Sequence, residues 1–336
     1  MPMLPVEDAE TLVANALIAC GCAPGNAMSV ARALVGAEID GQAGHGLSRV
    51  ASYAAQVRAG KVAGGAAPQV SRPKPGWLEV DAGHGFAFPA FDLAIDAVSA
   101  AAAETGIAAA AISRSHHCGQ AGRHVERLAD RGCVGLLFAN TPEAMAPWGG
   151  SKPLFGTNPI AFAAPRRGEA SLVIDLSLSV VARGKIMAAG KRGEAIPEGW
   201  AFDADGNPTT DPKAALAGSM VPMGEAKGAA LALMVEVLAA ALTGGRFGFE
   251  ATSFLNAEGG PPDVGQLLLA VDIRATAGEA FLDRMAVLTD AMLAQDGVRL
   301  PGSSRLARRE AAARDGIAVD DAVLAELQGL ADGDAG

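Results

Sequence analysis

Short apolar runs alternate with stretches of helical periodicity from Trp77 onward, and this alternation restricts the chain to few folds. The runs cover residues 78–81, 107–113, 134–139, 160–164 and 172–175, and a further one covers 266–271. Short apolar runs bounded by turn residues predict buried strands. Because helical stretches separate most of them, we expect an α/β architecture, a mixed sheet covered by helices.

The two ends of the chain lack this alternation and are expected to be mainly helical. Three helices are expected at 7–20, from an Asn26 cap to residue 39, and at 47–59, with a glycine-rich loop at 40–46. Residues 197–212 and 259–265 read as loops, 227–242 as a long helix, and 278–336 as helices ending in a short acidic tail. We therefore divide the chain into an N-terminal helical segment (1–73), a central α/β region (74–276) and C-terminal helices packing back on the first segment (277–336).

Composition and charge exclude several classes of protein. Of the 336 residues 50% are hydrophobic and 19% charged, which suits a globular chain with a large core. The net charge of −10, with no basic face, argues against nucleic acid as a partner. The apolar run 228–242 is shorter than the roughly 20 residues that a bilayer requires, so no membrane partner is expected. The first residues lack the features of a signal peptide, which favours the cytoplasm.

The four cysteines do not indicate a metal site. Cys20, Cys22, Cys118 and Cys133 have neither zinc-ligand spacing nor the density of a disulfide scaffold. We expect reduced thiols that pack in the core, and no metal. The pair Cys20 and Cys22 alone would be a weak metal signal.

A dinucleotide-binding glycine loop is also missing. The nearest approach to G-x-G-x-x-G is Gly83-His84-Gly85, whose third position is Phe88. A Rossmann fold therefore has no support from the sequence.

His45 and Arg49 lie four residues apart where the glycine-rich loop enters a helix. An imidazole can transfer a proton near neutral pH, and a guanidinium can bind a carboxylate through two hydrogen bonds. A 2-oxo-acid reductase needs both groups. The alternative is a histidine that caps the helix and an arginine solvated on its surface.

Two further segments are polar and stand at the ends of expected strands. Residues 115–122 follow a strand and open a helix, whose free N–H groups would suit a cofactor phosphate or carboxamide. The alternative is plain capping, with Ser115 as the N-cap. Residues 153–159 form a turn in which Thr157 could make a polar contact, or a simple connection.

Together these strings carry a resemblance over essentially the whole chain. HGLSR, SHHCGQAG, APWGGSKPLFGTNPIAFAAPR, VIDLSLSVVARGK, GEAKGAALALMVEVLAAALTGG and RLPGSSR resemble, in order and spacing, the type II malate/L-lactate dehydrogenase family. That family is similar in turn to sulfolactate dehydrogenases, ureidoglycolate dehydrogenase and cyclic ketimine reductases. The resemblance implies a non-Rossmann sulfolactate/malate dehydrogenase-like fold, a homodimer, and hydride transfer between NAD(P)H and C2 of a small anionic 2-oxo or 2-hydroxy acid.

The resemblance also assigns roles. Residues 1–73 would carry the substrate and acid/base loop, and residues 74–276 would bind NAD(P). His45 would be the general acid/base, with His117 rather than His116 as the family's recurring histidine in the site; Arg49 would bind the substrate carboxylate and Thr157 would touch substrate. The residues that would line the cofactor are His117, Cys118, Gly119, Gln120, Ala121, Asp175, Leu176, Ser177, Ala226, Lys227, Arg299, Leu300, Pro301, Gly302, Ser303, Ser304 and Arg305. Arg299 and Arg305 could bind a 2′-phosphate, which favours NADPH.

Two departures from the family pattern bear on the substrate. Many relatives have serine where this chain has Gly44, and the ketimine reductases resemble a Ser-His-Asp relay whose Asp position is Lys185 here. Lys185 in the site would favour a substrate with a second anionic group over a cyclic imine; the alternative is a surface lysine. Cyclic ketimine reduction and a non-catalytic ligand-binding homologue remain the alternative functions.

Overall fold

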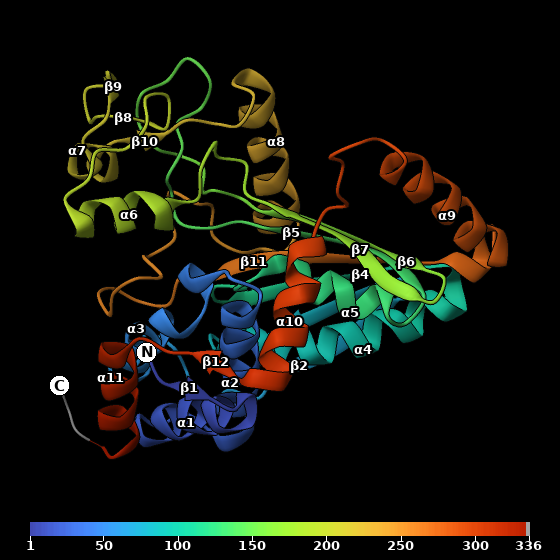
Figure 1. Cartoon of the computed structure of the whole chain (residues 1–336), viewed down its shortest axis with the longest axis horizontal. Coiled ribbons are helices and arrows are strands. Elements are labelled where there is room, and N and C mark those ends of the chain that lie inside the picture. The colour runs from blue at the N-terminus through green and yellow to red at the C-terminus, as the bar shows by residue number, and fades with distance from the viewer. Residues whose placement is uncertain (334–336) are drawn as a thin grey trace.

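A seven-stranded mixed sheet forms the centre of the computed structural model, which describes residues 1–333 (Figure 1). Its strands, in spatial order, are β2 (Gln69–Lys74), β3 (Trp77–Asp81), β4 (Ile107–Ser115), β11 (Val264–Asp272), β5 (Cys133–Ala139), β6 (Ile160–Arg166) and β7 (Glu169–Leu176). Only the β3–β4 pair is parallel; the other neighbours in this sheet are antiparallel. A Rossmann sheet is mostly parallel, so the expected non-Rossmann α/β fold is confirmed.

The two faces of this sheet are covered to different extents. Small and branched residues such as Ala161, Ala163 and Val173 pack on one face against α4 (Ala87–Thr105) and α5 (Ala121–Ala129). On the other face α8 (Ala226–Glu236) and the π-helical turn Val237–Ala241 contact β5 and β11. Near the far end of this face α9 (Glu279–Leu293) contacts β6, and Figure 1 shows the strands uncovered between α8 and α9.

An upper part of the molecule lies above one end of the sheet (Figure 1). It holds α6 (Arg183–Arg192), α7 (Pro212–Ala217) and a small sheet in the order β10 (Ser219–Met220), β8 (Ala201–Phe202), β9 (Pro208–Thr209). The sequence interpretation of 197–212 as a plain loop was wrong, because β8 and β9 pair there. Strands of two residues carry no periodic pattern that could reveal them.

The helices from the two chain ends pack together in a lower part. They are α1 (Val6–Ala19), α2 (Pro24–Ile39), α3 (Val50–Arg58), α10 (Ser303–Asp315) and α11 (Asp321–Ala331), with short 3-10 turns at Ala43–His45 and Leu47–Arg49. A further 3-10 turn, Ile273–Ala275, follows β11 and contacts α9 instead. Strand β1 (Met3–Leu4) pairs with β12 (Ile317–Ala318). One apolar cluster contains Val13, Tyr53 and Leu327. The division of the chain into three parts stays a prediction. Residues 334–336 of the acidic tail lie outside the described residues.

Two capping assignments were wrong and one strand was missed, each for an identifiable reason. Helix α2 begins at Pro24, and the Asn26 amide donates instead to the carbonyls of Gly64 and Ala66, at 2.9 and 2.8 Å. Ser115 ends β4 and caps nothing, because the N-cap of α5 is Gln120. Strand β2 was missed because it is exposed throughout and contains a proline.

Within residues 1–333 no helix is long and apolar enough to cross a membrane, and a cytoplasmic location stays a prediction.

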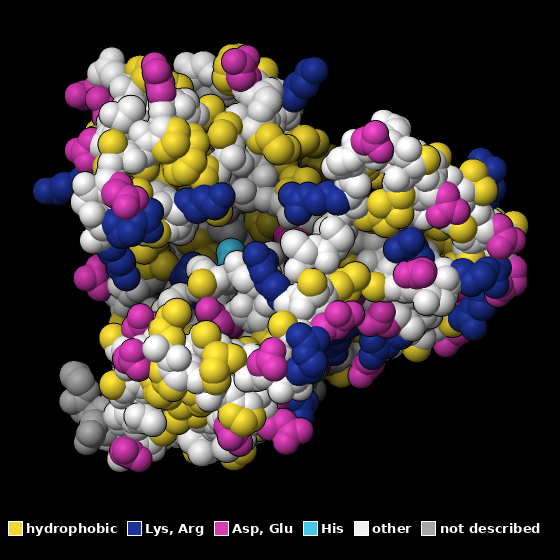
Figure 2. Space-filling view, viewed as in Figure 1, with side chains coloured by type: hydrophobic (Ala, Val, Ile, Leu, Met, Phe, Trp, Pro, Cys, Tyr) yellow, Lys and Arg dark blue, Asp and Glu magenta, His cyan; other side chains and the backbone are white. Residues whose placement is uncertain are grey.

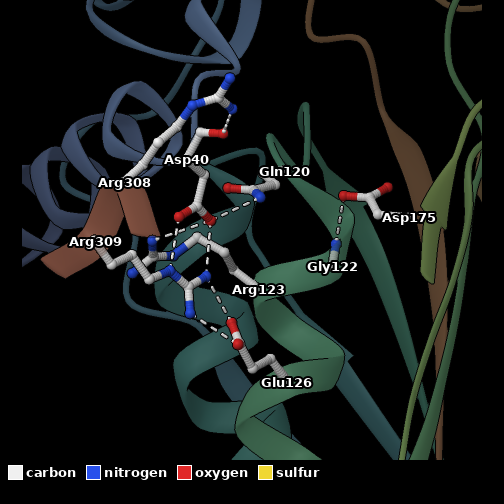
Figure 3. Close-up of polar contacts among 8 residues, drawn as sticks. All are labelled: Asp40, Gln120, Gly122, Arg123, Glu126, Asp175, Arg308 and Arg309. Carbon is white, nitrogen blue, oxygen red and sulfur yellow. Dashed lines mark hydrogen bonds and ion pairs between the residues drawn. The ribbon is translucent and has the colours of Figure 1, made fainter. Parts of the chain in front are cut away.

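A buried aspartate joins the lower part to the layer beneath the sheet (Figure 3). Asp40, at the end of α2, is 2% exposed and accepts from Nε and Nη2 of Arg309, both at 2.7 Å. Gln120 donates to the same carboxylate at 2.9 Å, and Arg309 also binds both oxygens of Glu126 at 2.8 Å. Burial opposes ionisation, but the Arg309 and Gln120 hydrogen bonds hold the pKa of Asp40 below its ordinary value. One carboxylate therefore fixes α2 to α10 and, through Arg309 and Glu126, to α5.

Replacing this carboxylate should be costly. Asp40→Asn should destabilise the protein by about 3 kcal/mol, as for removing one partner of a buried pair, whereas Asp96→Asn in the exposed pair with Arg131 should cost less than about 1 kcal/mol. Calorimetric melting of both variants checks this. Since the pKa of Asp40 is lowered on folding, the difference should be complete above about pH 4 and shrink as the pH falls below it. Equal melting temperatures for the two variants would contradict the role given to Asp40.

Candidate active site

His45 and Arg49 project from the two 3-10 turns that follow α2. Glu38 Oε2 accepts from the Leu47 amide at 3.0 Å, and Arg49 Nε donates to the Gly44 carbonyl at 2.6 Å. These two hydrogen bonds hold the segment 44–49 in place. In the part of the chain that the structure describes, neither Nη of Arg49 has a protein partner. Burial and the Arg49 charge lower the pKa of His45 to about 4. The site thus holds a neutral imidazole beside a guanidinium with two free donor groups.

His117 completes this group from the loop after β4. Its ring stacks on His45, with centroids 5.2 Å apart and planes 23° from parallel, and Tyr53 Oη lies 2.7 Å from its Nδ1. Burial raises the pKa of the Tyr53 phenol, so this phenol stays protonated and donates to Nδ1. Burial also lowers the pKa of His117 well below its ordinary value. The proton of the neutral ring is therefore on Nε2.

His116, the adjacent histidine, faces a different environment. Its Nε2 lies 2.9 Å from Gln56 Oε1, whose amide nitrogen donates to the Phe254 carbonyl at 3.0 Å. Gln266 donates to the His116 carbonyl at 3.0 Å, and burial lowers the pKa of His116 to about 3. Only His117 stacks on His45. The sequence interpretation did not include Tyr53 or Gln56, because α3 gave only a pattern for packing.

The loop before α5 and the end of β7 meet at one point. Asp175 Oδ2 accepts from the Gly122 amide at 2.8 Å, so one of the free N–H groups expected to suit a cofactor is already used by a carboxylate. Burial raises the pKa of Asp175. Gly119 has φ +66° and Phe88 lies 2.8 Å from where a Cβ would stand, so glycine is required there. Cys118 is buried, Ala121 begins α5, and Leu176 and Ser177 are half-buried beside Asp175.

The segment 299–305 ends in the first turn of α10. The N-cap of this helix is Gly302, no side chain caps its free N–H groups, and Ser303 and Ser304 are exposed beside them. Arg305 is buried with Nη2 3.4 Å from the Val173 carbonyl, whereas Arg299 is exposed. An uncapped helix N-terminus with hydroxyls and a guanidinium fits a phosphate of a dinucleotide. A shallow pocket at this turn is lined by Leu300, Pro301, Gly302, Ser303, Arg305 and neighbours including Arg166.

Thr157 lies three residues before the start of β6. Its amide donates to Thr141 Oγ1 at 2.9 Å, and the next residue, Asn158, has φ +41° and donates to Glu236 Oε1 at 2.9 Å. Glu236 is buried on α8, so the apolar run carrying it also fixes this turn. Neither Asn158 nor Glu236 was among the expected site residues.

Lys185 lies in the first turn of α6 and is exposed, and Ala226 and Lys227 begin α8, also exposed. Figure 2 shows a hollow between the upper and lower parts, with a histidine at its floor and Lys or Arg side chains on its rim. The structure brings His45, Arg49 and His117 together. No hydrogen bond or ion pair of the described residues joins Lys185 or Thr157 to them.

A separate pocket of about 350 Å³ lies between α5 and α10 and contains none of these side chains. Residues 1–333 hold no group of three or more possible metal ligands.

Comparison with known proteins identifies the family of the chain. The malate/L-lactate dehydrogenase family matches residues 4–328, and the chain belongs to that family. It is 54% identical over 330 residues to a (2R)-3-sulfolactate dehydrogenase (NADP(+)) of Chromohalobacter salexigens, covering 98% of both chains. The chain is therefore an NAD(P)-dependent oxidoreductase of the malate/L-lactate dehydrogenase family.

Solved structures extend the comparison to the fold. The Δ1-piperideine-2-carboxylate reductase of Pseudomonas syringae pv. tomato is 36% identical with a TM-score of 0.93, covering 98% of this chain and 100% of its own. The sulfolactate dehydrogenase of Methanocaldococcus jannaschii is 28% identical with a TM-score of 0.90, covering 98% and 97%. The fold is the one expected from the resemblance.

Proposed function

We propose that the protein interconverts (2R)-3-sulfolactate and 3-sulfopyruvate with NADP. The 54% identity over 98% of both chains to an enzyme of that name carries this assignment. The site supports it: Arg49 has two free donor groups for the substrate carboxylate, and Lys185 and Lys227 supply exposed positive charge on the opposite part. A substrate with a carboxylate and a sulfonate is a dianion, which such a site would favour.

His45 is proposed as the residue that moves the proton between solvent and the oxygen on C2, and Arg49 as the group that orients the carboxylate. When bound, the nicotinamide would supply or accept the hydride at C2. Thr157 would contact substrate. His117 would donate from Nε2 toward the reacting groups, since Tyr53 occupies Nδ1. The uncapped N-terminus of α10, with Ser303, Ser304, Arg305 and Arg299, would bind cofactor phosphates.

A substrate panel tests the assignment. With NADP+, kcat/KM for (2R)-3-sulfolactate should exceed that for lactate by about ten- to a hundredfold, the value of a lost charged hydrogen bond. Lys185→Ala should reduce that ratio if the sulfonate is bound there, whereas Lys191→Ala, at the other end of α6, should leave it unchanged. NAD+ should be the poorer cofactor.

Cyclic ketimine reduction is the second candidate, favoured by the 36% identical piperideine-2-carboxylate reductase structure. An imine arrives as a cation, and a lysine in the site opposes it by like-charge repulsion. Reduction of Δ1-piperideine-2-carboxylate with a higher kcat/KM than sulfopyruvate would replace the first assignment with this one.

The pKa of His45 predicts opposite pH profiles for the two reaction directions. Oxidation needs the neutral ring, so its kcat/KM should be constant near neutrality and fall as the pH drops through about 4. Reduction needs the protonated ring, so its kcat/KM should fall about tenfold per pH unit as the pH rises above that value. Initial rates in both directions, with His45→Ala as a control expected to lose about 10²- to 10⁴-fold in kcat, check this. A pH-independent reduction rate would assign the proton to another group.

The part of the sheet face that lies uncovered between α8 and α9 is proposed as the interface of a homodimer. Leu136, Phe162 and Ile174 are register partners across β5, β6 and β7, each half-buried and pointing away from the face that packs on α4 and α5. Leu233 and Val237 on the adjoining helical segment are 53% and 51% exposed. A continuous apolar face of this kind suits a second copy of the chain.

Light scattering on the purified protein tests this interface. The wild type should have twice the mass of one chain, and Leu233→Glu should shift the mass toward one chain at micromolar concentration. Val70→Glu changes an exposed valine on the edge strand β2 and should leave the mass unchanged. A wild-type protein with the mass of one chain would refute the proposal.

A further inference from the structure

The long connection between α8 and β11 has little structure of its own. Residues 242–263 contain no helix or strand, and among the described residues no backbone–backbone hydrogen bond involves 252–262. Connections of this length without regular structure are uncommon and are usually functional. Contacts with other parts of the chain must therefore hold this segment in place.

Lys61, just after α3, provides such contacts. It is 1% exposed, and its Nζ donates to the carbonyls of Ser253, Asn256 and Glu258 at 2.7, 3.1 and 2.7 Å. An ammonium group has three donors, and here each one has a carbonyl from the segment. No carboxylate of the described residues forms an ion pair with it. A buried charge is tolerated only when it is compensated in this way.

The segment that Lys61 binds also carries Phe254 into the candidate site. The Phe254 ring lies 5.2 Å, between centroids, from both His116 and His117. Gln56 on α3 donates to the Phe254 carbonyl at 3.0 Å while its Oε1 contacts His116. Phe254 is 7% exposed, whereas Leu255, Asn256 and Glu258, which follow it, are exposed. Phe254 is thus the side chain through which this segment reaches the histidines.

We propose that Lys61 is a positioning residue of the active site: by binding three carbonyl oxygens of 253–258, its ammonium holds Phe254 against His117. The proposal rests on the proposed function for its kinetic consequences but not for the structural ones. Without the ammonium the three carbonyls lose their donors, and a segment lacking backbone hydrogen bonds opens. Phe254 then leaves His117, and water reaches a ring that is neutral because it is buried.

Limited proteolysis tests the structural half of the proposal independently of turnover. Thermolysin cleaves before large apolar side chains, and Phe254 and Leu255 offer such sites within the segment. In Lys61→Met, which keeps the length but removes the donors, cleavage within residues 252–260 should be at least about tenfold faster, while α4 stays intact. Lys61→Arg retains donors and charge and should protect the segment better than Met. Lys74→Met, which changes an exposed lysine on β2, should leave the cleavage rate unchanged. Unchanged cleavage of this segment in Lys61→Met would overturn the proposal, even if the enzyme proves to act on another substrate.

Kinetics test whether Lys61 acts through Phe254. We expect Lys61→Met to lower kcat by about ten- to a hundredfold with a smaller change in KM for NADP+, as for a small displacement in an active site. Phe254→Leu should have a similar effect, and the double variant should be no worse than either single one. Additive losses would show that Lys61 does not act through Phe254.

Chemical rescue completes the test. Lys61→Ala removes three methylenes and the ammonium, so propylammonium should restore part of kcat, whereas 1-propanol, which lacks the three N–H donors and the charge, should not. The same additive should leave wild type and Lys74→Ala unaffected. If Lys61→Ala does not fold, the comparison of Lys61→Arg with Lys61→Met decides in its place. Equal kcat values for Arg and Met would refute a role for the ammonium.

Discussion

The arrangement of the candidate site depends on the buried carboxylate of Asp40. It stands where α2 ends and the loop to His45 begins, and its partners Arg309 and Gln120 come from α10 and from the loop that carries His117. Taking the charge out of water is unfavourable, and only the full set of donors compensates for it. The same carboxylate therefore fixes the start of the His45 loop and the end of the His117 loop. A displacement of either would separate His45 from His117.

Polar contacts play a similar part elsewhere around the hollow, because the segments there are irregular. The turn at Thr157 depends on Glu236 through Asn158, and the connection before β11 depends on Lys61. Glu236 and Lys61 are both buried, and each belongs to a regular helix or closely follows one. Each binds backbone groups or a side-chain amide of a loop. The helices and the sheet thus provide fixed positions, and buried polar side chains transmit those positions to loops that have no hydrogen-bond ladder of their own.

The sequence allowed much of this fold to be predicted but little of its polar framework. Strands β3 to β7 and β11 were expected because their apolar runs leave few alternatives, whereas β2 is exposed and polar. His45, Arg49 and His117 were expected from the loops and the family resemblance. Tyr53 and Lys61 were not, since a tyrosine inside a helix and a lysine after it fit ordinary packing and solvation equally well. Their partners, His117 and residues 253–258, are distant in the chain, and no local pattern encodes such a pairing.

Position 44 lacks the serine hydroxyl found in many relatives, although the structure leaves room for one. A Cβ at Gly44 would meet no atom within 4 Å, so serine would fit there. Without that hydroxyl, and with both histidines neutral, the site contains the Arg49 charge but no protonated imidazole. An anionic substrate at Arg49 would offset the charge that lowers the pKa of His45, so that binding itself would favour protonation of the ring. A dianion would do this more strongly than a monoanion. The charge of the substrate would then contribute to catalysis as well as to binding, which links the preference for a second anionic group to the proton transfer.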